Sequence, residues 1–467
     1  MLLFIQLTDI NNWLWSTVLI AMLVGCALYF SVRTGFMQVR LFGEMVRAIV
    51  RPERRDSRDA HVKHISSFQA FVIALGSRVG TGNLAGVATA ISLGGPGAVF
   101  WMWVIAVLGS VSAFVESTLA QLYKRKAPGA YIGGPSYYMQ YGLGRRWMAL
   151  LFAVLMCLTF GFAYNSVQSN TIALAWQHAF GIDPLWMGFV LTVLTLVIIF
   201  GGVHRIAHFS QAVVPFMAIA YLLLALWVIA TNITLLPHVL CEIVGDAFGW
   251  HQAAAGGIGM TVMQGIKRGL FSNEAGEGSA PHAAATATVS HPVKQGLIQA
   301  LGVFVDTLVV CSCTAFIVLL SDADTSSSMG IELTQHALSQ HIGSLGPLFI
   351  AIAIWLFAFS SIIGNYYYGE SCIRFITRSR AALVAFRLMV AGMVMAGALM
   401  SLQLAWDLGD LMMALLAMCN LTAIAQLFPQ ARRLLIDYMQ QRKAGIDDPV
   451  FTRSQMPDIA PNLDAWE

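Results

Sequence analysis

The chain has 467 residues, of which 57% are hydrophobic and only 11% are charged. A soluble domain carries about 25% charged residues, so this composition excludes an ordinary soluble protein and indicates an integral membrane protein. The formal net charge of +3 is small and does not imply binding to nucleic acid. We therefore predict an all-α membrane protein embedded in a lipid bilayer.

Eleven apolar stretches follow one another along the chain, and each is about as long as a helix that crosses a bilayer. They lie near residues 12–31, 66–93, 97–122, 148–177, 185–203, 208–230, 255–285, 297–320, 346–370, 382–402 and 405–430. The first stretch has no basic region before it and no small-residue cleavage site, so we expect a retained helix and not a signal peptide.

The polar segments between these stretches divide the chain into parts. We expect an extra N-terminal transmembrane helix in 1–32, a basic cytoplasmic loop in 33–65, two halves of five helices in 66–230 and 255–430, and a cytoplasmic tail in 431–467. The loop is expected to contain a membrane-surface helix. The tail is polar, and we expect partial disorder over residues 435–467.

Lysine and arginine gather on one side of this arrangement. All but three of the 27 basic residues fall in the basic loop, in residues 123–147, in or beside the other loops of that side, or in the tail. The opposite loops hold acidic residues: Asp183, Glu242, Asp246, Asp322, Asp324 and Glu332. The positive-inside rule therefore predicts an extracytoplasmic N-terminus and a cytoplasmic C-terminus for a multi-pass protein of the cytoplasmic (inner) membrane.

Two of the apolar stretches are interrupted by polar, glycine-dense runs, at residues 76–83 and 271–279. Backbone polar groups need partners in hydrocarbon, so a broken helix is tolerated only where it lines a cavity or is buried in protein. The first run lies in the opening helix of one half and the second in the opening helix of the other. These two helices are predicted to run in opposite directions, which is typical of an inverted repeat with a binding site between its halves.

The chemistry of such breaks suits a zwitterion. Freed N–H groups at one helix end attract a carboxylate, and freed carbonyl groups suit Na⁺ or an ammonium group. Gly80 and Gly82 let the backbone approach a ligand closely, and Thr81, Ser272 and Asn273 add short polar side chains. The alternative is that these glycines only form a face where helices pack.

Charged residues inside the apolar stretches are a second signal. The acidic ones are Glu116, Glu274, Glu277, Asp306 and Glu370, and the basic ones are Arg78, Lys267 and Arg268. Such residues mark a ligand pathway, or they pair with one another to hold helices or gates. We expect Glu116 and Glu370, near the cytoplasmic ends, to pair with loop arginines.

Uncharged polar residues occur in the fourth and ninth stretches. Gln168 belongs to a polar run in the fourth, and Ser360, Ser361 and Asn365 share one face of the ninth. The two hydroxyls suit a sodium shell. Hydrogen bonds between or within helices are the alternative for all of them.

Motifs of soluble enzymes are absent from the sequence. It contains no Walker A loop, no HExxH and no CxxC pair, and its histidines are scattered. We therefore predict that the protein is not an enzyme and has no catalytic residues and no organic cofactor.

Six blocks of sequence resemble the alanine or glycine:cation symporter family. They are residues 67–70, 78–86, 94–103, 267–276, 278–284 and 357–364, and the likeness extends over nearly the whole chain. The resemblance implies a leucine-transporter-like fold with a 5+5 inverted repeat, preceded by one extra N-terminal helix, about 11 transmembrane helices in all. It also implies sodium-driven uptake of alanine and glycine, with serine or D-alanine taken by some members.

The resemblance further implies roles for individual residues. Gly80, Thr81 and Gly82 would hold the substrate carboxylate, while Phe271, Ser272 and Asn273 would line the other side and meet the ammonium group. Gln168, Ser361 and Asn365 would close the pocket. The backbone oxygens of Gly76 and Val79, with the hydroxyls of Ser360 and Ser361, would bind Na⁺.

Two positions depart from the family pattern. Many members have Trp in place of Asn365 and a non-acidic residue in place of Glu277. A smaller, polar residue at position 365 would widen the pocket or admit a more polar substrate.

The expected function is sodium-coupled import of a small neutral amino acid by alternating access. One alternative is a proton-coupled permease of the same fold, with Glu274 or Glu277 as the titrating group. Another is a non-concentrating channel or sensor.

Overall fold

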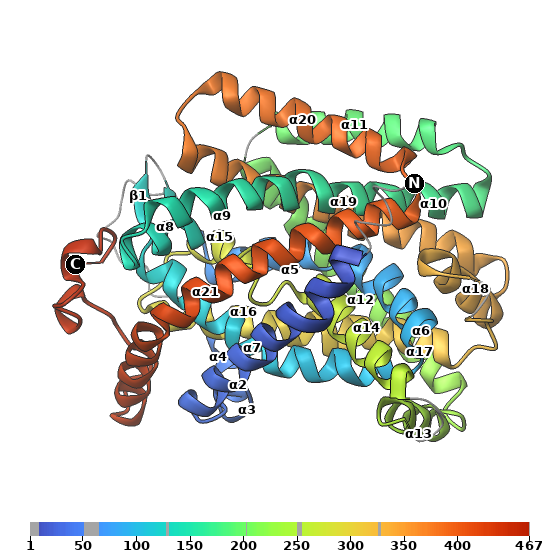
Figure 1. Ribbon diagram of the computed structural model, residues 1–467, viewed down its shortest axis with the longest axis horizontal. Helices are drawn as coiled ribbons and strands as arrows, with labels where there is room; N and C mark the ends of the chain where they lie inside the picture. The colour runs from blue at the N-terminus through green and yellow to red at the C-terminus, as the bar shows by residue number, and fades with distance from the viewer. Residues whose placement is uncertain are drawn as a thin grey trace.

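The computed structural model describes residues 9–50, 65–127, 130–201, 203–249, 255–325 and 328–466. These residues are almost entirely helical (Figure 1), as the sequence predicts. Two short strands, β1 (Arg125–Ala127) and β2 (Ala130–Ile132), pair antiparallel with Lys126 opposite Tyr131.

The helices follow the order of the apolar stretches. The first part of the chain forms η1 (Leu14–Leu19), α2 (Ile20–Thr34), α3 (Met37–Arg40), α4 (Phe42–Val50), α5 (Ser67–Arg78), η3 (Gly82–Gly86), α6 (Val87–Gly94), α7 (Gly97–Leu122), α8 (Pro135–Tyr137), η4 (Tyr138–Gly142), α9 (Arg146–Leu158), η5 (Thr159–Ala163), α10 (Tyr164–Phe180), α11 (Pro184–Ile199), α12 (Val203–Thr231) and α13 (Leu236–Ala247). The second part forms α14 (Ala255–Asn273), α15 (Ala280–Ala284), α16 (Pro292–Val303), η6 (Phe304–Cys311), α17 (Ser312–Leu319), α18 (Gly330–Ile342), α19 (Leu345–Ile376), α20 (Arg380–Leu399), α21 (Leu402–Lys443), η7 (Arg453–Gln455) and η8 (Ala460–Asn462).

The length and composition of the described helices support a multi-pass membrane protein. Seven helices are long and apolar enough to cross a membrane, or nine if each of two bent pairs is one span. Every one of the predicted stretches contains helix, but α11 has only 16 residues and the helix that begins with α14 is interrupted. The total of eleven spans and the 5+5 repeat therefore stay predictions.

Both predicted helix breaks are present, and both are narrower than the polar runs. The first helix stops at Arg78 and resumes beyond Gly80 with a bend of 52°. The second stops at Asn273 and resumes at Ala280. Glu274 has a φ of 54° there, a left-handed conformation that ends an α-helix.

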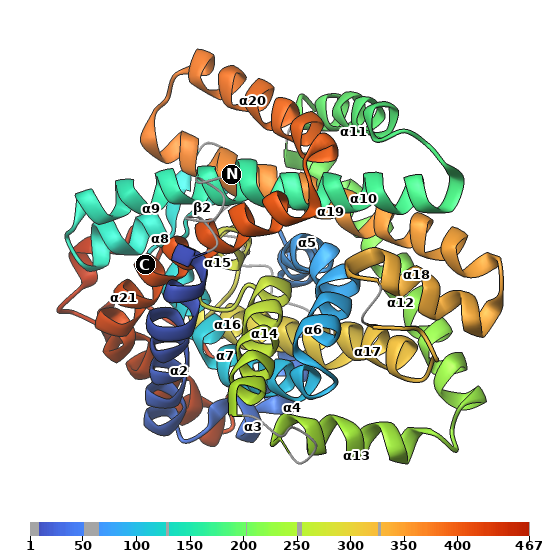
Figure 2. The ribbon, with the colours of Figure 1, turned by 45° about the vertical axis from the view of Figure 1, so that its right-hand side comes forward.

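The two broken helices lie at the centre of the bundle. Figure 2 shows α5, α6 and α14 surrounded by α7, α10, α19 and α21, and α14 packs directly on α6 and α7. Non-helical backbone at this depth is therefore buried in protein and not exposed to lipid, as the bilayer requires.

Two helices occupy segments that the sequence pattern assigned to loops. Helix α13 turns by 104° from the helix before it, and α18 precedes α19. They have only 12 and 13 residues, too few to cross a bilayer, so a search for apolar stretches of membrane-spanning length passes over them.

The C-terminal tail is ordered up to Trp466, contrary to the partial disorder expected for residues 435–467. Phe451, Leu463 and Trp466 are buried, and the two aromatic rings lie 5.3 Å apart. Trp466 donates a hydrogen bond from Nε1 to the carbonyl oxygen of Gln121 at 3.0 Å. A few widely spaced apolar side chains are enough to anchor this otherwise polar segment.

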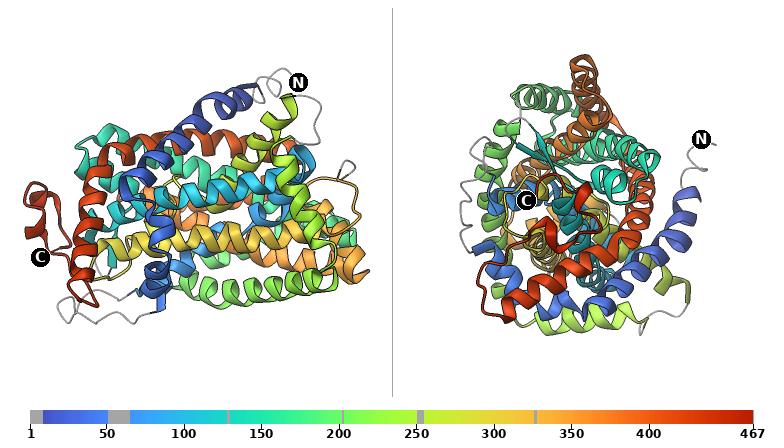
Figure 3. Two further views of the ribbon diagram at one scale, coloured as in Figure 1. Left: turned by 90° about the horizontal axis from the view of Figure 1, so that it is seen from below. Right: turned by 90° about the vertical axis from the view of Figure 1, so that its left-hand side faces the viewer.

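The segments rich in lysine and arginine gather at one end of the bundle. Figure 1 places the β1–β2 hairpin, the α19–α20 connection and the tail at the same end. Figure 3 shows that α2 runs toward that end. The described part of the tail and the start of the N-terminal helix therefore lie at different ends of the bundle.

Candidate functional site

The first break presents two backbone N–H groups to uncharged acceptors. Gly80 donates its N–H to Oδ1 of Asn83 at 2.9 Å, and Thr81 donates its N–H to Oε1 of Gln168 at 2.9 Å. The Thr81 hydroxyl is buried and has no hydrogen-bond partner among the described residues. A carboxylate is a stronger acceptor than a side-chain amide, so it competes well for these donors.

Glycine is required at the first break because other helices press against it. A Cβ at Gly80 would overlap the Ser361 hydroxyl and lie 2.9 Å from Oε1 of Gln168. A Cβ at Gly82 would lie 2.9 Å from Cα of Ser272 and 3.1 Å from the Phe271 ring. The predicted substrate residues from α10, α14 and α19 thus surround the first break.

Four oxygens gather at the same break. Ser360 Oγ lies 3.1 Å from the carbonyl oxygen of Gly76, and it makes a shorter hydrogen bond of 2.8 Å to the carbonyl oxygen of Phe357 in its own helix. Ser361 Oγ lies 3.4 Å from the same oxygen and 3.3 Å from the carbonyl oxygen of Val79. These are the residues predicted for Na⁺, and unwound carbonyl groups are the ligands that broken transporter helices offer to that ion.

Two of the predicted pocket residues have different contacts. Asn365 accepts a hydrogen bond from Ser77 Oγ at 2.9 Å and donates one to Asn165 at 3.1 Å. Asn273 donates to Thr307 at 3.2 Å and accepts the N–H of Ala275 at 3.0 Å. Asn365 thus links three helices beside the site, while Asn273 stabilises the second break itself.

An aromatic and ionic cluster lies next to Phe271. The Phe271 ring packs between Tyr164 and Trp406, with ring centroids 4.7 and 4.8 Å away. The guanidinium of Arg268 lies 4.2 Å from the centre of the Trp406 ring.

Both basic side chains of this cluster pair with one buried carboxylate. Lys267 contacts Asp410 at 2.7 Å, and Arg268 contacts it through two nitrogens at 3.0 Å each. Both basic residues are among the charged residues predicted to be functional from the sequence, but Asp410 is not. Its position inside the last apolar stretch was the signal that could have found it.

At the second break, the freed backbone N–H groups are hydrogen-bonded to the carboxyl group of Glu116 inside the protein. Glu116 accepts the N–H groups of Gly276 at 3.3 Å and Gly278 at 3.1 Å, and an amide N–H of Asn420 at 2.7 Å. The prediction that Glu116 pairs with a loop arginine is therefore wrong, because the freed N–H groups of the break need an acceptor inside the protein. The matching prediction for Glu370 is confirmed by its ion pairs with Arg374 and Arg387.

Asp306 connects the two broken helices. It accepts Ser272 Oγ at 2.7 Å from α14 and Asn83 Nδ2 at 2.8 Å from η3. Glu277, the second residue that departs from the family pattern, accepts the Tyr164 hydroxyl at 3.0 Å. Buried carboxylates therefore lie close to both sides of the candidate site.

A helical membrane protein with two interrupted helices around such a site has the architecture of a secondary transporter. The fold is similar to that of MhsT, a transporter of the leucine-transporter fold crystallised with L-phenylalanine. The TM-score is 0.56 at 12% sequence identity, covering 86% of this chain and 94% of MhsT. At this identity the likeness shows the fold alone.

The chain belongs to the sodium:alanine symporter family, whose model matches residues 3–453. It is 53% identical to the probable sodium/glutamine symporter GlnT of Bacillus subtilis, over 94% of this chain and 91% of that protein. It is 34% identical to the sodium/alanine symporter AgcS of Methanococcus maripaludis, over 90% and 94% of the two chains. The family resemblance is thereby confirmed, and the protein is a membrane transporter and not an enzyme.

Proposed function

We propose that this protein is a sodium-coupled symporter that imports a small neutral amino acid by alternating access. One observation carries the proposal: the oxygen cluster of Gly76, Val79, Ser360 and Ser361 directly adjoins the N–H groups of Gly80 and Thr81. A cation-binding set and an anion-binding set therefore share the same few residues of one broken helix.

In this proposal the substrate carboxylate takes the N–H groups of the first break, and the Thr81 hydroxyl gains a partner. The ammonium group faces Phe271, Ser272 and Asn273 at the carbonyl end of α14, where the helix dipole favours a positive charge. Gln168, Ser361 and Asn365 close the pocket around a small side chain.

Coupling follows from the shared backbone. Na⁺ bound to the carbonyl oxygens of Gly76 and Val79 fixes the conformation in which Gly80 and Thr81 present their N–H groups. Each ligand then strengthens the binding of the other by the same factor. The membrane is the cytoplasmic (inner) membrane, with the C-terminus in the cytoplasm, and the charge distribution of the loops supports this orientation.

The test is uptake of radiolabelled alanine, glycine and serine into proteoliposomes containing the purified protein. Accumulation driven by an inward sodium gradient, and absent when choline replaces sodium, is expected. Uptake that persists without sodium and collapses with a protonophore would instead establish proton coupling. A failure to concentrate any substrate would establish a channel or sensor.

Glutamine is the second candidate substrate. The relative at 53% identity is named a probable sodium/glutamine symporter, and the side-chain amides of Asn365 and Asn165 lie beside the candidate site. Competition between labelled alanine and unlabelled glutamine distinguishes the two. Glutamine that competes at a lower concentration than alanine would make it the preferred substrate.

A further inference from the structure

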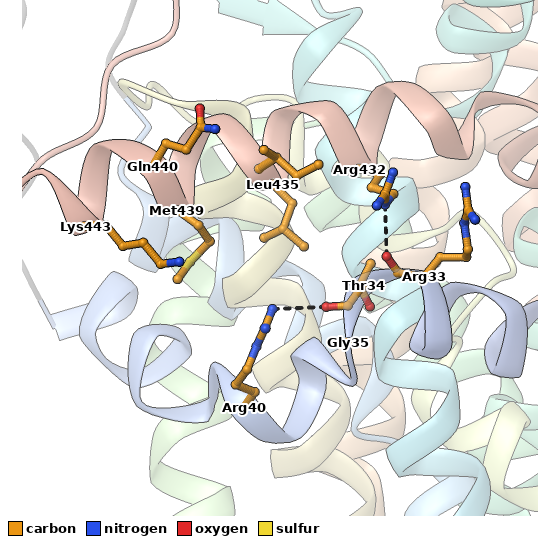
Figure 4. Close-up of a pocket in the computed structure, with 10 residues that line it drawn as sticks. Arg33, Thr34, Gly35, Arg40, Arg432, Leu435, Met439, Gln440 and Lys443 are labelled. Carbon is orange, nitrogen blue, oxygen red and sulfur yellow. Dashed lines mark hydrogen bonds between the residues drawn. The ribbon is translucent and has the colours of Figure 1, made fainter.

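A basic pocket lies far from the candidate transport site, between the end of α2 with α3 and the last turns of α21 (Figure 4). Its volume is about 390 Å³, and it is lined by Arg33, Thr34, Gly35, Arg40, Arg432, Leu435, Ile436, Met439, Gln440 and Lys443. Four of these residues are basic and none is acidic. The pocket lies at the end of the bundle where the basic segments gather.

Backbone contacts hold two of the guanidinium groups at the pocket. Arg40 donates from Nη2 to the carbonyl oxygen of Thr34 at 3.1 Å, and Arg432 donates from Nε to the carbonyl oxygen of Arg33 at 2.9 Å. Gly35 turns the chain between them with a φ of 64°. Each guanidinium has five N–H donors, so most of these donors remain available to an anion.

The positive charge of the pocket is not neutralised by the described part of the chain. No described carboxylate forms an ion pair with any of its four basic residues. The nearby Glu44 pairs with Arg47 and Arg442, which lie outside the lining, and Asp437 pairs with His291. Clustered arginines without acidic partners are suited to phosphate, which they bind through paired hydrogen bonds.

Exposed apolar side chains flank the pocket. Val32, Phe36 and Val39 are 63%, 50% and 66% exposed, and Ile436 of the lining is 42% exposed. A ligand that combines a phosphate with hydrocarbon chains contacts both kinds of surface at once. Basic pockets between transmembrane helices on the cytoplasmic side are suited to lipid head groups.

We propose that this pocket binds the phosphate head group of an anionic phospholipid from the cytoplasmic leaflet, with its acyl chains along α2 and α3. The lipid then joins the extra N-terminal helix to α21. Free inorganic phosphate shares the head-group chemistry, but it leaves the apolar flank uncovered.

The experiment uses the full-length protein in detergent, depleted of lipid and then given phosphatidylglycerol or phosphatidylcholine. Native mass spectrometry counts the lipids retained. The wild-type protein is expected to retain more phosphatidylglycerol than phosphatidylcholine. In the double variant Arg40→Gln/Arg432→Gln, the affinity for phosphatidylglycerol should fall about tenfold, which corresponds to roughly 1.4 kcal/mol of binding free energy. The matched control is Arg378→Gln/Arg380→Gln, which changes exposed residues just before and at the start of α20 at the same end of the bundle, and it should retain the lipid.

The variant Lys443→Gln separates a loss of charge from a disturbed fold, because the Lys443 side chain has no hydrogen bond to a described residue that the substitution would break. It should lower retention several-fold without changing thermal unfolding. Equal retention by wild type and the double variant, or no preference for phosphatidylglycerol, overturns the proposal. Displacement of the lipid by micromolar inorganic phosphate overturns the lipid as the occupant and identifies a free-anion site.

Discussion

The two helix breaks differ in what their N–H groups bind. At the first break, Gly80 and Thr81 donate to uncharged amide oxygens of Asn83 and Gln168. At the second, Gly276 and Gly278 donate to the carboxylate of Glu116.

If the proposed function is correct, this difference separates a binding element from a structural one. Hydrogen bonds to an ionised acceptor are roughly twice as strong as those between neutral groups. A substrate carboxylate can therefore replace the acceptors at the first break, whereas the second is already occupied by a carboxylate of the protein itself. Matching positions in two halves of a chain do not imply matching roles.

The largest effect is expected from a side chain inserted at the first break. Gly82→Leu should abolish uptake, because even its Cβ would lie 2.9 Å from the backbone of Ser272. Sodium-driven alanine uptake in proteoliposomes measures it. The matched control is Gly392→Leu in α20, where an added Cβ meets no atom within 4 Å. Normal uptake by Gly82→Leu would refute the assigned pocket.

Glu116→Gln tests the second break. It replaces one of the two accepting oxygens by an NH2 group, so that one of the Gly276 and Gly278 N–H groups loses its acceptor, and it should lower the free energy of unfolding by roughly 1–3 kcal/mol, the cost of a buried donor left unsatisfied. Thermal unfolding in detergent measures it.

The control for this variant is Glu332→Gln, whose carboxylate is 48% exposed and should contribute less than about 1 kcal/mol. The KM for substrate of the folded Glu116→Gln protein should stay within about twofold of wild type. A strongly raised KM with unchanged unfolding would show that the second break binds substrate.

Ser360→Ala tests the oxygen cluster. Removal of one hydroxyl ligand should raise the sodium concentration for half-maximal uptake by about tenfold, which is roughly 1.4 kcal/mol. At saturating sodium the KM for substrate should return to near the wild-type value. The sodium concentration for half-maximal uptake is measured by titrating sodium at a fixed alanine concentration. If it is unchanged in the variant, Ser360 is not part of the cation site.

The smallest effect is expected at Asn365. Asn365→Ala removes the contacts with Ser77 and Asn165 beside the pocket, but it touches neither the N–H groups nor the four oxygens of the first break. Alanine uptake should change by less than about threefold, while competition by glutamine should weaken more. Parallel changes for both amino acids would show that Asn365 has no part in selectivity.

Much of the candidate site could be predicted because its signals are local. The glycine-dense runs mark the breaks, and Ser360 and Ser361 are recognisable as hydroxyls on one helix face. Their partners were harder to predict. Glu116 is 160 residues from Gly276, and Asp410 is 142 from Arg268, so no periodicity connects them.

Parts of the fold escaped prediction for a related reason. A search for apolar stretches finds helices long enough to cross a bilayer, but α13 and α18 have only 12 and 13 residues. The tail was read as polar because its anchoring residues are few and widely separated. Burial of Phe451 and Trp466 depends on a surface that only the folded bundle provides.

The docked tail has a mechanical consequence. It hydrogen-bonds to Gln121 at the end of α7 through Trp466, and to Ser290 just before α16 through the N–H of Phe451, while it continues directly from α21. Because the tail is attached at these three points, it restricts relative movement of α7, α16 and α21 at this end of the bundle. We therefore expect a fusion partner or affinity tag behind Trp466 to disturb these contacts more than one at the N-terminus.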